Sequence, residues 1–334
     1  MTTTGTPEEL AHQLATAGDR QQRVDLLNAW ARELRDIQPQ RALACAQEAY
    51  SLAQGDPPYL EGLAESLTRL ADCHIQLGRY DLALPQALEG LALAEGQGYA
   101  DQRAQLLRTI GGIYEHLGNY PHALSYTLRA LYVCQTSGDR FGEGLTLNLL
   151  GIIYNKLGDY RQELAVYGHA IDIFQEAGQL RHVAIALNNI ATAYCSVGEA
   201  ARALEYAQRS LELARETGLS MLEATVLGTI GDAYLQLADY PQSLAYFQRA
   251  LVLARQVGFR YIEMYVLRSS GRVHAVQGQI DAAIPLLQEA LQIAEEIEAR
   301  AEVAECRRQL AEACRQQGDF ETALRYAEQG PENE

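Results

Sequence analysis

Apolar residues recur along this chain at the three- and four-residue steps of an α-helix. One such stripe lies between residues 179 and 197, and it predicts an amphipathic helix. It consists of Val183, Leu187, Ile190 and Tyr194. Gly198 follows the stripe and predicts its end, because glycine readily takes the positive φ that closes a helix. A second stripe occupies residues 200–217, so the pattern predicts two antiparallel helices of about 18 residues each, joined by a short turn.

This helix pair repeats along the chain with a constant period. The phrase LGNYPHAL begins at residue 117, LGDYRQEL at 157 and LADYPQSL at 237. The second residue of the phrase recurs as Gly78, Gly118, Gly158, Gly198, Ala238, Gly278 and Gly318. Seven positions earlier the residue is always small: Ala71, Gly111, Gly151, Ala191, Gly231, Gly271 and Ala311. Because two helices cannot bury both of their apolar faces alone, each pair must stack on the next. The predicted fold is therefore an all-α solenoid of antiparallel helix pairs.

The residues around the turn fit this interpretation. Asn119, Asp159 and Asp239 are candidate N-caps for the second helix of their pairs. Pro121 and Pro241 follow in the first turn, where a missing N–H costs little. The small residue before each turn lets the two helix backbones approach closely.

These motifs resemble the tetratricopeptide repeat family in its longer variant of about 40 residues. The residues that carry the resemblance are GGIY at 111–114, GIIY at 151–154, ATAY at 191–194 and GDAY at 231–234. The resemblance implies a right-handed superhelical solenoid. Residues 56–330 would form seven repeats, residues 1–55 atypical capping helices or a degenerate repeat, and residues 331–334 a tail.

Charge and composition narrow the class of partner. The formal charge is −16, with 27 basic and 43 acidic residues, which argues against nucleic acid or anionic lipid as a partner. No apolar stretch is long enough to span a membrane, and no secretory leader is evident, so we expect a cytoplasmic protein. The six cysteines show no metal-binding spacing. We expect no metal and no cofactor.

Polar positions on the first helix of each pair are the candidate binding site. In the family that this chain resembles, the first helices line the concave side and bind extended peptides or partner helices. Carried over by position, the candidates are Arg69, Arg108, Asn148, Asn188, Asn189, Thr192, Asp232, Arg268, Arg272 and Arg308. The asparagines would hydrogen-bond a peptide backbone, and the arginines would pair with carboxylates or phosphates. Arg268 and Arg272, one turn apart, are the strongest local pair. The alternative is an ordinary solvated helix face.

No arrangement of residues predicts catalysis. His74 and His274 fall in a core position, and Cys306 and Cys314 are expected to be small packing residues. The leading hypothesis is a non-enzymatic scaffold or sensor that binds a protein or peptide segment. A segment that carries acidic groups is one such partner. Two alternatives stay open: a regulatory region of a bacterial signalling enzyme such as a nucleotide cyclase or kinase, and a peptide-pheromone receptor. Self-association through terminal helices around Trp30 is a further expectation.

Overall fold

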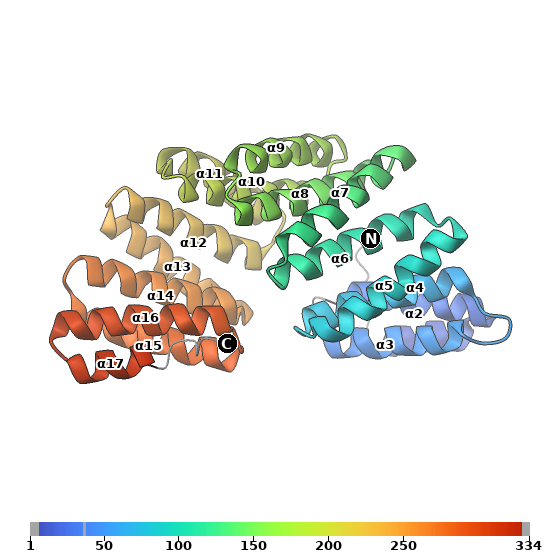
Figure 1. The fold of residues 1–334 in the computed structure, drawn as a ribbon, viewed down its shortest axis with the longest axis horizontal. Coiled ribbons are helices and arrows are strands. Elements are labelled where there is room, and N and C mark those ends of the chain that lie inside the picture. Colours follow the sequence, from blue (N-terminus) through green and yellow to red (C-terminus); the bar gives the residue numbers. More distant parts are fainter. Residues whose placement is uncertain (1–6, 36–37, 329–334) are drawn as a thin grey trace. The chain divides into compact units, whose positions relative to one another are not determined.

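The computed structural model describes residues 7–35 and 38–328, which form 17 α-helices and no strand (Figure 1). The helices divide into two compact units, residues 1–173 and 174–334, and the boundary falls inside α9. Unit 1 contains α1 (Pro7–Thr16), α2 (Arg20–Leu34), α3 (Pro39–Ala53), α4 (Leu60–Gln76), α5 (Tyr80–Gln97), α6 (Ala100–His116), α7 (Tyr120–Ser137), α8 (Arg140–Leu157) and most of α9 (Tyr160–Glu176). Unit 2 contains α10 (Leu180–Ser196), α11 (Ala200–Glu216), α12 (Ser220–Gln236), α13 (Tyr240–Val257), α14 (Arg260–Val276), α15 (Ile280–Glu296), α16 (Arg300–Gln317) and α17 (Phe320–Glu328). The all-α fold class is confirmed.

Helices of one pair, such as α6 with α7 or α12 with α13, pack along each other as antiparallel hairpins. The backbones of successive first helices also approach one another, α2 to α4 to α6 to α8 in unit 1 and α10 to α12 to α14 to α16 in unit 2. Successive second helices stand farther apart, and long side chains bridge them, as Arg129 does to Glu95 at 3.1 Å. The first helices therefore form an inner layer within each unit.

The small position before each turn is where the two helices of a pair meet. A Cβ added to Gly231 would lie 2.5 Å from the Phe247 ring, and one added to Gly271 would lie 2.8 Å from Leu287. Cβ atoms at Gly111 and Gly151 would collide with Thr127 and Tyr167 in the same way. Pairs with alanine in this position have alanine opposite it as well, at Ala71 with Ala87 and at Ala191 with Ala207, all fully buried. The two residues thus share the space between the helices, and each side chain larger than alanine in the second helix faces a glycine in the first.

The turns confirm the predicted caps. Asn119, Asp159 and Asp239 each accept a hydrogen bond from the backbone N–H three residues on, at 3.4, 3.1 and 3.2 Å. The helices from α4 onward begin at equal steps along the chain, so the turn between pairs has the same form as the turn within a pair. Nearly all of these turns place glycine at positive φ, and the exceptions are Ala238 at 56° and Glu298 at 55°.

Replacing Ala238 or Glu298 with glycine is expected to raise the free energy of unfolding by about 0.5–1 kcal/mol each, because a side chain strains the left-handed backbone. Chemical denaturation followed by circular dichroism measures the change. The reverse substitution Gly258→Ala, at the equivalent position with φ of 70°, serves as the control and should destabilise by a similar amount. A loss of stability in both glycine variants would contradict the assignment of strain.

The N-terminal helices correct one expectation. Trp30 does not form an exposed apolar edge: it is 5% exposed and packs within the core made by α2 and α3. Its Nε1 donates to Gln13 Oε1 on α1 at 3.0 Å. Self-association through the terminal helices stays a prediction. The predicted seven-repeat division of residues 56–330 stays a prediction, and the tail at 331–334 lies outside the described residues.

Candidate functional site

Polar side chains predicted to line a groove lie on the inner layer of first helices, but their environments differ between the units. In unit 2 the arginines are held by carboxylates of the same unit. Arg268 forms an ion pair with Glu302, and Arg272 forms one with Asp232 at 3.3 Å. Arg308 contacts Glu305 through two nitrogens at 2.6 and 2.8 Å. Each of these guanidinium groups therefore already has a carboxylate partner within unit 2.

Two tyrosines of α14 reinforce this network in unit 2. Tyr265 donates a hydrogen bond to Asp232, and Tyr261 donates one to Glu302 at 3.1 Å. Burial raises the pKa of Asp232, and the bond from Tyr265 together with the charge of Arg272 opposes that shift. Removing Arg268 and Arg272 would leave Asp232 and Glu302 without their cations, so the double variant would change stability as well as binding.

Asn188 also has an internal partner in unit 2. Its Oδ1 accepts a hydrogen bond from Thr229 Oγ1 at 3.0 Å, and Asn188 itself is buried. The Thr192 side chain is exposed and donates to the Asn188 backbone carbonyl at 3.1 Å. Asn189 lies half-buried on α10, and Asn148 lies half-buried on α8 in unit 1. The binding roles expected of Asn148, Asn188 and Asn189 stay predictions.

In unit 1 an arginine cluster surrounds Asp72. The Arg69 guanidinium is buried, with Nη1 at 3.0 Å from Asp72 and Nε at 2.9 Å from Glu65. Arg35 lies 3.8 Å from the same Asp72 oxygen, and Thr109 donates to its other oxygen at 3.4 Å. Arg69 is thus committed to internal partners. Arg108 is half-buried beside this cluster, and burial lowers its pKa while the charge of Asp72 opposes the shift.

A cavity of about 490 Å³ opens over this cluster in unit 1. Its walls come from the first helices of four successive pairs and from the turn before α8. The lining residues are Arg32, Arg69, Asp101, Gln105, Arg108, Ser137, Gly138, Asp139, Phe141, Gly142 and Leu145. Arg69 and Arg108 were predicted from the sequence, whereas Arg32 and Phe141 were missed.

The repeat register could have identified Arg32 as a candidate from the sequence. It lies one repeat period before Asp72 and two before Gly112, in the register of the predicted inner-layer positions. The predicted repeats begin at residue 56, so they do not include α2. Phe141 lies in the first turn of α8, where the inner-layer register predicts no candidate.

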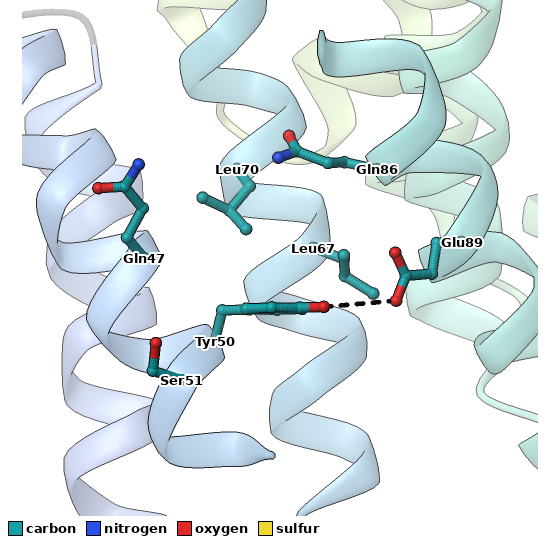
Figure 2. Close-up of a pocket in the computed structure, with 7 residues that line it drawn as sticks. All are labelled: Gln47, Tyr50, Ser51, Leu67, Leu70, Gln86 and Glu89. Carbon is teal, nitrogen blue, oxygen red and sulfur yellow. Dashed lines mark hydrogen bonds between the residues drawn. The ribbon is translucent and has the colours of Figure 1, made fainter.

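A second, smaller cavity of about 290 Å³ lies in unit 1 between the second helices α3 and α5 (Figure 2). Leu67 and Leu70 of α4 form its apolar floor, and Gln86 of α5 also lines it. Tyr50 of α3 reaches across to Glu89 of α5 at 3.5 Å. The cavity forms because α3 and α5 stand apart, and Tyr50 spans the gap between them.

The histidines and cysteines considered in the sequence analysis lie among packed side chains or contact a neighbouring side chain. His74 is 5% exposed, and burial lowers its pKa, as expected for a packed histidine. His274 is half-buried, and its Nδ1 lies 2.7 Å from Gln279 Oε1. Cys306 and Cys314 are buried packing residues, as predicted. Within residues 7–35 and 38–328, no group of His, Cys, Asp or Glu is arranged to hold a metal ion. None of the helices described is both long enough and apolar enough to span a membrane.

Comparison with known families decides the classification. The tetratricopeptide repeat model matches residues 102–176, 182–256 and 263–330, which together make up more than half of the chain. The chain belongs to the tetratricopeptide repeat family. The resemblance drawn from the small-residue and tyrosine positions is thereby confirmed. A search of curated proteins finds no match to this tetratricopeptide repeat chain.

Solved structures of tetratricopeptide proteins share the fold. A Rap protein complexed with competence and sporulation factor has a TM-score of 0.70 at 16% identity, covering 93% of this chain and 96% of its own. The apo form of the quorum sensor NprR from B. thuringiensis has a TM-score of 0.72 at 17% identity, covering 96% and 90%. A signal transduction ATPase with a tetratricopeptide repeat sensor, from Pyrococcus horikoshii, has a TM-score of 0.72 at 15% identity. The match covers 98% of this chain but 51% of the ATPase, so the chain spans about half of that protein.

Proposed function

We propose that this tetratricopeptide array is a non-enzymatic binding protein that holds a protein or peptide segment on its inner layer, as a scaffold or sensor. The observation that carries the proposal is the cavity of about 490 Å³ built from first helices of successive pairs in unit 1. A groove bounded by rigid, packed helices can bind an extended segment without paying to order its own walls.

The solved tetratricopeptide structures support a peptide as the partner. The Rap structure contains a signalling factor, and NprR is a quorum sensor. Binding of a short peptide signal is therefore the form of sensing that we favour over docking of a large folded domain. A cytoplasmic site of action, expected from the sequence, is compatible with such a partner and stays a prediction.

Matched glycine substitutions test the proposal. Gly112 lies on the inner layer one turn after Arg108, and Gly168 lies on the second helix α9; a Cβ added at either meets nothing within 4 Å. Gly112→Gln should therefore fold normally while obstructing the inner layer of unit 1. Thr192→Gln, in the same register and exposed on α10, obstructs unit 2. Gly168→Gln is the control.

Peptides selected by display from a random library against the wild type provide the ligands. Each should lose affinity by about tenfold with Gly112→Gln or Thr192→Gln and retain it with Gly168→Gln. Fluorescence anisotropy measures the affinities. A library that yields no peptide above background, or peptides that both inner-layer variants bind as tightly as the wild type, would refute the proposed function.

A further inference from the structure

The smaller cavity of unit 1, which we name the α3–α5 cavity, opens between two second helices and over the first helix α4 (Figure 2). Leu67 and Leu70 form its apolar floor, while Tyr50, Gln86 and Glu89 form polar walls. Its volume of about 290 Å³ is small for a site that encloses a whole ligand molecule. The cavity therefore suits a single large side chain.

Gln86 occupies a position at which the second helices from α7 onward carry an apolar or aromatic residue. The residues in this register are Tyr126, Val166, Tyr206, Tyr246, Leu286 and Tyr326. Three of these tyrosines stack on a tyrosine of the first helix in their own pair, as Tyr126 does on Tyr114 with ring centroids 5.6 Å apart. In the pair α4 and α5, His74 and Gln86 replace the two tyrosines. That pair therefore lacks the stacked rings.

The residue three positions after Gln86 differs in charge as well. This register holds Arg129, Arg209 and Arg249 in α7, α11 and α13. Each guanidinium lies over the tyrosine ring three residues before it, at 5.1, 5.9 and 4.9 Å from the ring centroid. In α5 the position is Glu89. The walls of the α3–α5 cavity thus lack both the ring and the cation that three other second helices supply.

Two polar groups of the cavity are poorly satisfied. Gln86 Oε1 is buried and accepts no hydrogen bond from the part of the chain that the structure describes. Glu89 accepts one from the Tyr50 hydroxyl at 3.5 Å, which is long for such a bond. No arginine or lysine among the described residues forms an ion pair with Glu89. A ligand that brings a hydrogen-bonding group and a cation would satisfy both groups.

Exposed apolar side chains continue along the second helices of unit 1. Leu88 directly precedes Glu89 on α5, and Leu128 has the matching position on α7; both are exposed. Tyr132 lies one turn after Leu128 and is 66% exposed. A free small molecule seated in the cavity would leave these side chains in water, whereas a protein segment would cover part of them. The occupant that fits this surface is a protein segment.

We propose that the α3–α5 cavity is a second binding site, which receives a tyrosine side chain of a partner protein segment while an adjacent arginine of that segment pairs with Glu89. The ring lies on Leu67 and Leu70, and its hydroxyl hydrogen-bonds to the Gln86 amide. A hydroxyl both donates and accepts, so it satisfies either end of that amide. The formal charge of −16 adds attraction for a basic segment. This site goes beyond the proposed function, which concerns the inner layer.

Six synthetic peptides test the side-chain preference. Each is acetylated, amidated and flanked by Gly-Ser, and its central pair is Tyr, Phe or Ala followed by Arg or Gln. Nuclear magnetic resonance of protein with isotope-labelled leucine methyl groups follows the signals of Leu67 and Leu70 during titration. The Tyr-Arg peptide should bind about tenfold more tightly than Ala-Arg, because a buried ring contributes most of the contact area. It should bind about two- to fivefold more tightly than Phe-Arg or Tyr-Gln.

A variant that fills the cavity from within assigns the binding to this site. Tyr50 has the register of Leu91, because α3 and α5 align on their buried small residues. Tyr50→Leu combined with Gln86→Tyr therefore reproduces the combination of Leu91 and Tyr126 found one pair later. The introduced ring should occupy the cavity and weaken binding of the Tyr-Arg peptide by about tenfold.

Single substitutions separate the two polar contacts. Glu89→Gln should abolish the preference for Tyr-Arg over Tyr-Gln. Gln86→Ala should abolish the preference for Tyr-Arg over Phe-Arg. Glu212→Gln is the matched control, because Glu212 is exposed on the second helix α11 and lies outside the cavity. Circular dichroism verifies the folding of each variant.

Three results would overturn the inference. These are equal binding of the Tyr-Arg and Ala-Gln peptides, unshifted Leu67 and Leu70 signals at millimolar peptide, and undiminished binding by the folded cavity-filling variant. The comparison of peptides on the wild type decides the matter even where a variant folds poorly. Gly112→Gln and Thr192→Gln should leave this binding unchanged, so the α3–α5 site and the proposed function stand or fall separately.

Discussion

Replacing Gly231 with alanine is expected to lower the free energy of unfolding by about 1–3 kcal/mol in the wild-type background. The new Cβ would lie 2.5–3.0 Å from the Phe247 ring, and Phe247 is fully buried, so the ring has no free space to move into. Helix propensity favours alanine by at most about 1 kcal/mol, which is smaller than the overpacking cost. Denaturant titration followed by circular dichroism measures the change.

The effect of the same substitution should change sign when the ring is absent. Phe247→Ala alone should cost about 3–5 kcal/mol through the cavity that it leaves. Adding Gly231→Ala to that variant should then recover about 1 kcal/mol, because the methyl group fills part of the cavity and improves helix propensity. The double variant reproduces the alanine pair found at Ala191 and Ala207. Gly112→Ala, where the Cβ meets nothing within 4 Å, should be stabilising by about 0.5–1 kcal/mol. Additive effects of the two core substitutions would contradict the shared-volume account.

Replacing Glu163 with glutamine is expected to stabilise the protein by about 1–2 kcal/mol at pH 8. Glu163 is 1% exposed and occupies a position that is small in the other pairs. Its carboxylate accepts hydrogen bonds from Asn155 Nδ2, at 3.1 Å to each oxygen, and no arginine or lysine of the described chain forms an ion pair with it. Burial raises the pKa of Glu163 above the usual value of 4.5, and the bond from Asn155 opposes that shift only in part.

The pH dependence of this gain has a definite direction. A carboxyl group with a raised folded-state pKa stabilises the native state most below its unfolded pKa, and that contribution is lost as pH rises through the folded pKa. The wild type should therefore lose stability relative to Glu163→Gln between about pH 4 and pH 8. Thermal unfolding of both proteins across that range measures the difference. A constant difference would show that Glu163 titrates normally.

Glu263 provides a control of opposite sign. Burial acts to raise its pKa, but hydrogen bonds from Arg255 and Arg260, at 2.8 and 2.6 Å, outweigh burial and lower the pKa. Its contribution is present above the unfolded pKa and is lost as pH falls through the folded pKa. Glu263→Gln should therefore be destabilising at neutral pH, and the deficit should shrink as the solution is acidified.

Much of the fold could be predicted from the sequence because the same spacing of apolar, small and capping residues recurs in successive repeats. The repeat register located the hairpins, and the caps at Asn119, Asp159 and Asp239 hold as expected. The prediction of an exposed apolar edge failed at Trp30, which is buried and donates a hydrogen bond to Gln13 of α1. Terminal residues contact a single neighbouring repeat, so periodicity carries no information about what covers them.

The candidate site was only partly predictable. The register placed Arg69, Arg108, Arg268 and Arg272 on the inner layer, but it did not show which of them had partners. Asp232 and Arg272 are one repeat period apart and lie opposite each other on neighbouring first helices, so this pair was available in the sequence. Glu302 reaches Arg268 from a different register, and that contact depends on how two helices pack.

The sequence by itself determined the helices, their turns, the small position before each turn and the inner layer, because all of these depend on spacing within one repeat or between adjacent repeats. Only the tertiary structure decided that Arg268, Arg272 and Arg308 of unit 2 contact carboxylates while Arg108 and Arg32 of unit 1 line a cavity. The physical reason is that charge pairing depends on distances of a few ångströms between side chains on different helices, and the linear pattern does not fix those distances.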